Sequence, residues 1–348
     1  MTLPAIDQTY LINFLTGLLN TPSPTGFTEH GIEYTQTALA VFPELSLSLT
    51  RKGALLVKIP GQRSDAPRAL TAHVDTLGAM VKEIKSNGRL KITRIGGLVL
   101  DAVETEGCTV FTSEGKKIRG SLMVNPASSH VYGKMTTEVD RNEDNMEVRL
   151  DECTTNAEET HDLGIEVGDF IAFDPRVEVN NGFVRSRFLD DKACVAVLVA
   201  AVRALHNAGL KPLQTTYILF SNYEEVGHGA AAGIPAEVTE LLAVDMAAVG
   251  EGQTSDEHHA SICVKDSGGP YHHAMCTRLR KLADQSKIPY KVDIYPYYGS
   301  DGEAFWHAGA DVRVALIGPG VDASHNYERT HLDALMATTQ WVLAYLLN

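Results

Sequence analysis

The chain has 348 residues, of which 44% are hydrophobic and 21% charged, and its formal net charge is −14. An apolar fraction of this size can bury a core, which excludes wholesale disorder, and no heptad or glycine repeat indicates a coiled coil or a collagen-like rod. A general nucleic-acid binder should carry a basic surface, and the acidic balance argues against that class.

The cysteines and the apolar segments indicate in which cellular compartment the protein is expected. The five cysteines are widely spaced and form no CxxC pair, which argues against a disulfide framework and against a thiolate zinc site. We expect no signal peptide, because no basic segment followed by an apolar one opens the chain. No apolar run reaches the roughly 18–20 residues of a membrane span. The sequence therefore predicts a cytoplasmic protein that binds neither nucleic acid nor membrane.

The first 77 residues predict two helices and three strands. Apolar residues recur at helical spacing over Tyr10–Leu19, a segment that stops before a Pro- and Gly-containing breaker at 21–26, and a second helix fits Glu29–Phe42. Strands are expected at Leu45–Thr50, Ala54–Ile59 and Ala69–Val74. The last of these is mostly apolar and is followed by a polar turn, as in a buried central strand.

Residues 78–177 have a different texture. Helical periodicity is lost, and short strand-like runs alternate with Gly, Pro, Asn and Asp turns. The runs are Leu90–Ile95, Cys108–Thr112, Ser121–Val124, Glu147–Leu150 and Phe170–Phe173. This pattern predicts a small all-β insertion, a barrel or a sandwich. Eleven acidic and three basic residues lie between 131 and 166, which indicates a solvated face, with a cation-binding segment as the alternative.

The alternation of helices and strands resumes after Arg185. We expect helices at Asp191–Asn207, Tyr271–Ser286 and Leu332–Leu347, and strands at Thr215–Ser221, Leu241–Asp245, Lys291–Tyr295 and Val312–Ile317. Such alternation predicts an α/β fold with a mostly parallel sheet between layers of helices. The catalytic domain would comprise residues 1–77 and 178–348, and the inserted β domain residues 78–177.

Polar residues interrupt the chain at the ends of several predicted strands. In open α/β sheets the ligand site lies beyond the carboxyl ends of the strands, so these residues are candidates for chemistry. They are His73 and Asp75, Asp190 and Asp191, Glu224 and Glu225, Asp245, and His325. Each also has a structural explanation: a buried His satisfied by an acid, a helix cap, an acidic helix start, a turn acid or a surface-loop His.

Taken together, the candidates form an ordered series of imidazoles and carboxylates without a thiolate. Such nitrogen and oxygen donors suit Zn, Co or Mn, and their number suits two ions rather than one. Two bridged ions lower the pKa of a water, and an unligated glutamate can accept its proton. The adjacent pairs His258–His259 and His272–His273 are interpreted as structural, because neighbours on a helix point about 100° apart.

Five motifs in this order are similar to those of the di-metal glutamyl/deblocking aminopeptidases, the family that includes the tetrahedral aminopeptidases. They are AHVDTLG, SRFLDDKA, NYEEVGHGAA, AVDMA and SHNYERTH, with supporting stretches GIEVGD, KDSGGP and YGSDGE. The resemblance extends over nearly the whole chain. It departs from the common pattern at Thr76, where many members carry Glu, and at Lys192, where many carry Arg, and the first departure bears on substrate preference.

The resemblance implies a role for each candidate. His73 and Asp245 would bind one metal, Glu225 and His325 the other, Asp190 would bridge both, Glu224 would be the general base, and Asp75 would orient His73. Asp190 is preferred to Asp191 because the family tolerates an amide at the second place. The ions would be Zn or Co, or else Mn. The β insertion would mediate dimer contacts in a homo-oligomer, up to a dodecamer built from dimers.

The implied activity is the hydrolysis of N-terminal residues from short peptides. A di-metal deacylase or amidohydrolase acting on a small conjugate is the alternative. Deacylases of that kind insert their lid after the bridging Asp, whereas the insertion here precedes Asp190, which favours the aminopeptidase. A third alternative is an inactive oligomeric shell. The sequence does not fix which N-terminal residue is preferred.

Overall fold

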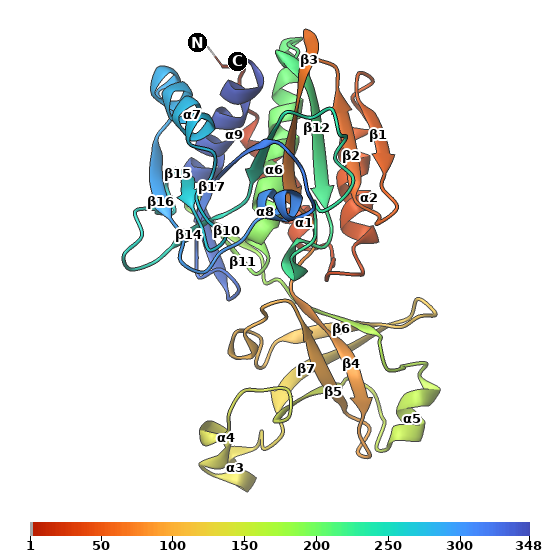
Figure 1. Ribbon diagram of the computed structural model, residues 1–348. Coiled ribbons are helices and arrows are strands. Elements are labelled where there is room, and N and C mark those ends of the chain that lie inside the picture. Colours follow the sequence, from red (N-terminus) through yellow and green to blue (C-terminus); the bar gives the residue numbers. More distant parts are fainter. Residues whose placement is uncertain (1–2) are drawn as a thin grey trace. The chain divides into compact units, whose positions relative to one another are not determined.

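The computed structural model describes residues 3–348. The chain divides into two compact units (Figure 1). Unit 1 comprises the residues up to Thr76 and those from Arg176 to Asn348, and unit 2 comprises Leu77–Pro175. None of the helices within residues 3–348 is both long and apolar enough to cross a bilayer.

Unit 1 is built on a sheet of twelve strands. Their bounds are β1 (Ser46–Leu49), β2 (Leu55–Ile59), β3 (Arg63–His73), β10 (Glu178–Asn180), β11 (Phe183–Ser186), β12 (Gln214–Ser221), β13 (Glu240–Val244), β14 (Ala247–Val249), β15 (Ala260–Lys265), β16 (Tyr290–Ile294), β17 (Arg313–Asp322) and β18 (Glu328–His331). The main path runs β1-β2-β12-β3-β13-β17-β18-β11-β10. Its centre, β12-β3-β13-β17, is parallel, and antiparallel strands extend it on both sides.

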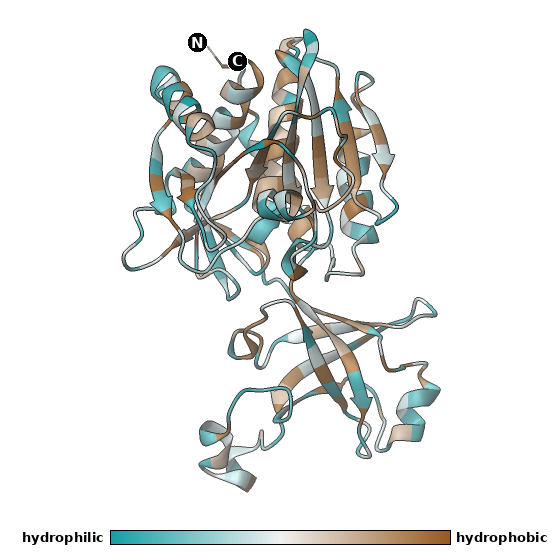
Figure 2. Cartoon of the chain, viewed as in Figure 1, coloured by the Kyte–Doolittle hydropathy of each residue, from teal (hydrophilic) through white to brown (hydrophobic). Residues whose placement is uncertain are grey.

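The central strands are apolar on both faces. Every residue of β12 and of β13 is buried, and Figure 2 shows these strands among the most hydrophobic parts of unit 1. Parallel strands need cover on both faces, which explains why they read as continuous apolar runs rather than alternating ones. The predicted α/β class is therefore confirmed, with antiparallel edges added to the parallel centre.

Six helices of four residues or more accompany the sheet in the described part of unit 1. They are α1 (Gln8–Leu19), α2 (Glu29–Leu39), α6 (Leu189–Ala208), α7 (His273–Ser286), α8 (Asp301–His307) and α9 (Leu332–Leu346). α6 is buried over most of its length and packs against β3, α1 and α9. An Ala-, Val- and Leu-rich sequence without a polar face suits this enclosed position. Gly209, with φ +63°, ends the helix in the left-handed conformation.

Unit 2 contains a closed six-stranded barrel in the order β4-β5-β8-β7-β6-β9. The strands are β4 (Gly78–Ile84), β5 (Leu90–Ile95), β6 (Gly107–Phe111), β7 (Lys117–Val124), β8 (Met146–Leu150) and β9 (Phe170–Phe173), with short helices α3 (Ser129–Tyr132), α4 (Met135–Glu138) and α5 (Ala157–Asp162) between them. Burial alternates along β7, as expected for a barrel strand. The acidic stretch is mostly exposed, but Glu147 is buried and pairs with Lys85 and Arg89.

All five cysteines are free, and four of them are buried. The prediction that no disulfide framework holds the chain is consistent with their positions. Cys153 is the exposed one and lies in unit 2.

Candidate metal centre

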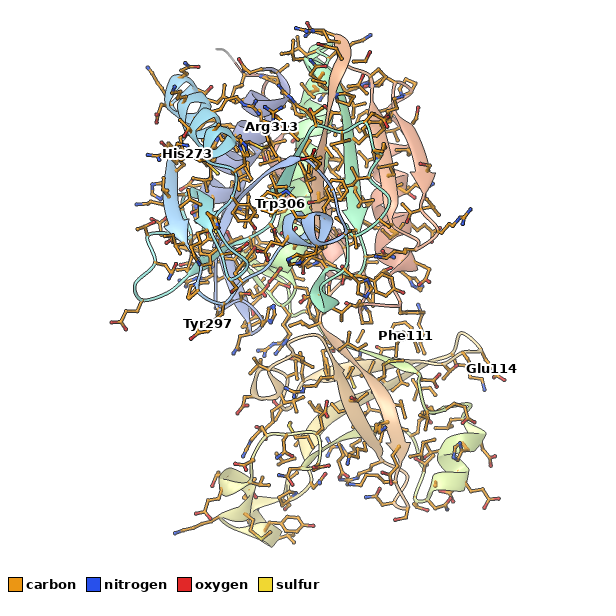
Figure 3. All side chains as sticks on the ribbon, viewed as in Figure 1. Phe111, Glu114, His273, Tyr297, Trp306 and Arg313 are labelled. Carbon is orange, nitrogen blue, oxygen red and sulfur yellow. The ribbon has the colours of Figure 1, made fainter. Side chains whose placement is uncertain are left out.

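The parallel strands of unit 1 deliver polar side chains to one edge of the sheet. His73 is the last residue of β3, Asp245 directly follows β13, and a short turn of 3₁₀ helix at Glu224–Val226 follows β12. Arg313, labelled in Figure 3, marks the opposite edge, because it begins β17 where these residues end their strands. Strand polarity alone therefore gathers residues that are far apart in the sequence.

Asp190 stands between two imidazoles. Its Oδ1 lies 3.2 Å from Nε2 of His73, and its Oδ2 lies 3.6 Å from Nε2 of His325. The hydroxyl of Ser324 donates to Oδ2 at 3.1 Å. Each oxygen of one buried carboxylate thus faces a different imidazole, which is the arrangement that a bridging ligand requires. The peptide bond between Asp190 and Asp191 is cis.

The two glutamates that follow β12 divide between the same imidazoles. Glu224 Oε2 lies 3.7 Å from Nε2 of His73, and Glu225 Oε2 lies 3.6 Å from Nε2 of His325. Burial is the main cause that raises the pKa of both carboxyls well above the usual value, and Asp190 raises that of Glu225 further. The adjacent residues Glu224 and Glu225 therefore face different imidazoles of the same site.

Asp75 contacts both His73 and the turn that carries the two glutamates. Its backbone carbonyl lies 2.9 Å from Nδ1 of His73, and its carboxylate lies 3.5 Å from the same nitrogen. The carboxylate also accepts the backbone N–H groups of Glu224 at 3.2 Å and of Glu225 at 3.3 Å, and the Thr25 hydroxyl at 2.7 Å. Burial works to raise the pKa of Asp75, but its contacts with His73 and Thr25 lower it overall. The Asp75 carboxylate thus stabilises the turn that begins at Glu224.

Asp245 completes one half of the site. One ligand atom each from Asp245, His73 and Asp190 lie within 4.8 Å of one another. Burial, followed by the charge of Asp190, raises the pKa of Asp245 to about 7. Such a cluster is the geometry expected of three residues that share one cation.

His325 lies in the loop between β17 and β18 and has φ +63°. Its backbone N–H donates to Glu328 at 3.1 Å, and the backbone N–H of Asp190 donates to the other oxygen of Glu328, also at 3.1 Å. One buried carboxylate therefore holds the backbone at both Asp190 and His325. Glu328 lies in the SHNYERTH motif, but the sequence alone did not indicate this role for it.

A second carboxylate without an assigned role in the sequence is Asp301, at the start of α8. It accepts the Ser221 hydroxyl and the N–H of Ala230 at 2.7 Å. It therefore holds the end of β12 close to the turn that follows the glutamates. The only sequence signal was its place in the YGSDGE stretch.

The chemistry of this donor set fits divalent cations. Carboxylates from four segments gather here with two imidazoles, and burial works against the charged forms of Glu224, Glu225 and Asp245. Buried charges are stable only when they are paired or hold metal ions. Nitrogen and oxygen donors without sulfur suit Zn, Co or Mn.

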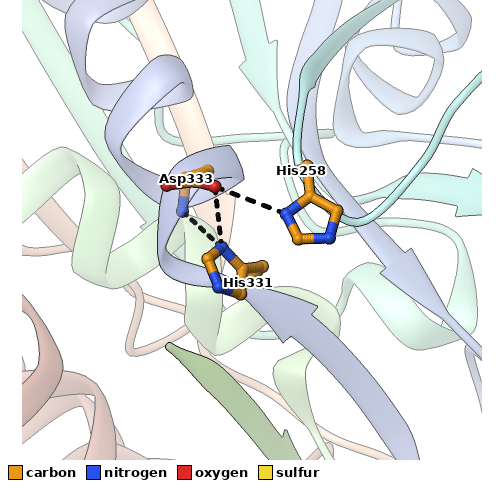
Figure 4. Close-up of side chains that lie close together, drawn as sticks. All are labelled: His258, His331 and Asp333. Carbon is orange, nitrogen blue, oxygen red and sulfur yellow. Dashed lines mark hydrogen bonds and ion pairs between the residues drawn. The ribbon is translucent and has the colours of Figure 1, made fainter. Parts of the chain in front are cut away.

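Another group of possible ligands lies elsewhere in unit 1 (Figure 4). Asp333 Oδ2 lies 3.3 Å from Nδ1 of His258 and 3.1 Å from Nδ1 of His331. The backbone N–H of Asp333 donates to Nδ1 of His331, and Nε2 of the same ring faces the carbonyl of Asn181. The lone pair on Nδ1 of His331 therefore caps α9. The ring has a structural role, and this nitrogen is not available to a cation.

Comparison with known proteins places these features in a family context. The family model of the M42 glutamyl aminopeptidases matches residues 53–341. The chain is 47% identical over 330 residues to a putative aminopeptidase, YhfE, of Bacillus subtilis, covering 94% of this chain and 95% of that protein. It is 21% identical over 284 residues to a lysyl aminopeptidase of Pyrococcus furiosus, covering 80% and 78%.

Solved structures share the fold. A TET aminopeptidase from the archaeon Thaumarchaeota archaeon SCGC AB-539-E09 has a TM-score of 0.88 and 18% identity, over 97% of this chain and 96% of that one. The TET1 peptidase of Pyrococcus horikoshii, which can assemble into a tetrahedron or a large octahedral shell, has a TM-score of 0.83 and 21% identity, over 97% and 99%.

Proposed function

The chain belongs to the M42 glutamyl aminopeptidase family and is a peptide hydrolase, and we propose that it removes N-terminal residues from short peptides at a centre of two divalent cations. The observation that carries this proposal is the position of Asp190, whose two oxygens face His73 and His325 separately. His73, Asp245 and Asp190 would hold one cation, and His325, Glu225 and Asp190 the other. Zn or Co, or else Mn, suits these donors.

The cations, when bound, would polarise the scissile carbonyl group and lower the pKa of a water molecule. The remaining work falls to side chains of the chain itself. Glu224 would accept a proton from the attacking water through its carboxylate and then donate it to the departing amine. Asp75 supports this role, because it accepts the backbone N–H of Glu224 and so holds in place the turn that carries this side chain.

Metal restoration tests the proposal. Enzyme stripped by a chelator is assayed with Zn, Co or Mn added back, on leucyl, lysyl, arginyl and glutamyl p-nitroanilides. N-acetyl amino acids provide the contrast with a deacylase. We expect no activity without metal, restored p-nitroaniline release with at least one ion, and no deacylation. Release of acetate without release of p-nitroaniline would contradict the peptidase assignment.

We also propose that the chain forms a homo-oligomer, up to a dodecamer built from dimers, through its β domain. The assemblies of the Pyrococcus horikoshii relative support this. Unit 2 itself exposes apolar side chains on and beside its short helices, with Val131 73% and Met135 59% exposed. Apolar side chains grouped on a surface are typical of a contact with another subunit.

A further inference from the structure

The cavity at the metal centre extends beyond the proposed ligands. It has a volume of about 660 Å³ and is lined by Asp190, Glu224, Glu225, Asp245 and His325, and also by Glu303 of α8. The apolar side chains of Met246, Ala248 and Ala304 line it too. Tyr297, 96% exposed and labelled in Figure 3, stands among the lining residues. The cavity thus contains both the proposed metal centre and the carboxyl group of Glu303, which the proposed mechanism does not use.

The carboxyl group of Glu303 is held in a built position. It forms a hydrogen bond with the side chain of Asp266, which is fully buried. A Cβ atom at Gly268 would come within 1.6 Å of Glu303 Oε1, so the carboxyl group lies directly against the backbone of this glycine.

Asp266 is fixed in turn from two sides. Its carboxylate accepts the Tyr271 hydroxyl and the N–H of Gly268, the latter at 3.0 Å. The Tyr271 hydroxyl also lies 2.8 Å from Oγ of Ser300, the residue that caps α8. The acidic pair therefore rests on a buried network and not on a mobile surface side chain.

This wall of the cavity is acidic. Burial, followed by the hydrogen bond and charge of Asp266, raises the pKa of Glu303 to about 8, and a cationic group bound beside Glu303 would favour its ionised form. Lys265 acts in the opposite direction, and its ammonium donates to the backbone carbonyl of Asp266 at 2.8 Å. His307, one turn further along α8, lines the cavity, and the described lining contains no Lys or Arg.

We infer that Glu303 determines substrate specificity, by binding a cationic side chain on the N-terminal residue of the peptide. This inference rests on the proposed function. The methylene groups of a lysine or arginine would lie along Met246, Ala248 and Ala304, and the charged end would meet the Glu303 carboxylate. An acidic N-terminal residue would meet like charge and bind poorly.

The test compares kcat/KM for lysyl, arginyl, leucyl and glutamyl p-nitroanilides in the wild type and in Glu303→Gln, both with metal restored. We expect the wild type to prefer the basic substrates. The variant keeps the shape of the side chain but cannot ionise beside a bound cation, so the lysyl-to-leucyl ratio should fall by about tenfold or more, mainly through a higher KM for the lysyl substrate.

The control Glu251→Gln removes one carboxylate from an exposed position outside the lining and should keep the wild-type ratio. A wild type that prefers leucyl or glutamyl substrates, or a Glu303→Gln enzyme with an unchanged ratio, would overturn the inference while leaving the peptidase function in place. Absence of hydrolysis on all four substrates with every metal would instead refute the proposed function itself.

Discussion

At the scale of single residues, Asp190 connects the two halves of the centre. Asp190 is only 8% exposed, and its carboxylate faces both imidazoles. Removal of this side chain would therefore leave neither half of the centre with a complete set of donors. We expect Asp190→Ala to lose bound metal and activity together. Metal analysis of the purified protein measures the first, and Asp311→Ala, at an exposed position, is the matched control. A normal metal content in Asp190→Ala would show that the bridging assignment is wrong.

Glu224 should behave differently from the proposed ligands. Glu224→Gln keeps the size of the side chain but cannot accept a proton, and removal of a general base typically lowers turnover by about 10²–10⁴-fold. We therefore expect near-normal metal content with kcat reduced by at least about 100-fold. Kinetics and metal analysis on the same preparation check both points, with Glu251→Gln as the control. Near-normal kcat would exclude Glu224 as the base.

The residues at the strand ends were visible in the sequence, whereas the carboxylates that support them were not. An acid or a His after an apolar strand is a readable signal, because parallel strands end at one edge. Glu328 carries no such signal, since its task is to accept two backbone N–H groups that only the folded chain brings together. Asp301 is comparable, because it connects α8 to the end of β12.

At the scale of elements, β13 is anchored at the end opposite the metal centre. Glu240 begins the strand, is 2% exposed, and pairs with Arg278 and with Arg313 at 3.0 Å. The Tyr345 hydroxyl adds a contact at 3.3 Å. Removal of this buried carboxylate leaves its cations unpaired, but Arg278 and Arg313 are partly exposed, so solvent screens part of the loss. We expect Glu240→Ala to lower the free energy of unfolding by about 1–2 kcal/mol in chemical denaturation.

The pH dependence of that loss has a definite sign. Burial works to raise the pKa of Glu240, but Arg278 and the other cations lower it overall. A carboxyl whose folded pKa is depressed stabilises the fold above its unfolded pKa of about 4.3, and the benefit is lost as the pH falls through the folded value. The difference between wild type and Glu240→Ala should therefore shrink below about pH 4. A difference independent of pH would contradict this account.

Elements with a clear apolar pattern were predicted better than those without one. The strands Leu90–Ile95 and Phe170–Phe173 have the predicted bounds, and α6 begins and ends within two residues of the predicted Asp191–Asn207. The strands β10, β11 and β18, which extend the sheet beyond β17, were missed, because three or four residues with exposed positions give neither a period nor an apolar run. The helix α8 was missed for the same reason of length.

At the scale of the whole molecule, the proposed oligomer depends on the surface of the β domain. Val131 and Met135 project from the short helices between β7 and β8 of the barrel and are mostly exposed. We expect the double variant Val131→Asp with Met135→Asp to have a lower mass in light scattering, because charge opposes burial at a subunit contact. Val179→Asp, on β10 of unit 1, is the control. An unchanged mass would assign the contact to another surface.

The order of the donors along the chain has a consequence for biosynthesis. His73 precedes the barrel, and the imidazole of His325 arrives only after β17. A nascent polypeptide consequently has no working centre until almost all of its sheet has left the ribosome. Fragments that stop short of that loop should be inert, so an unfinished copy cannot trim the other proteins being made around it.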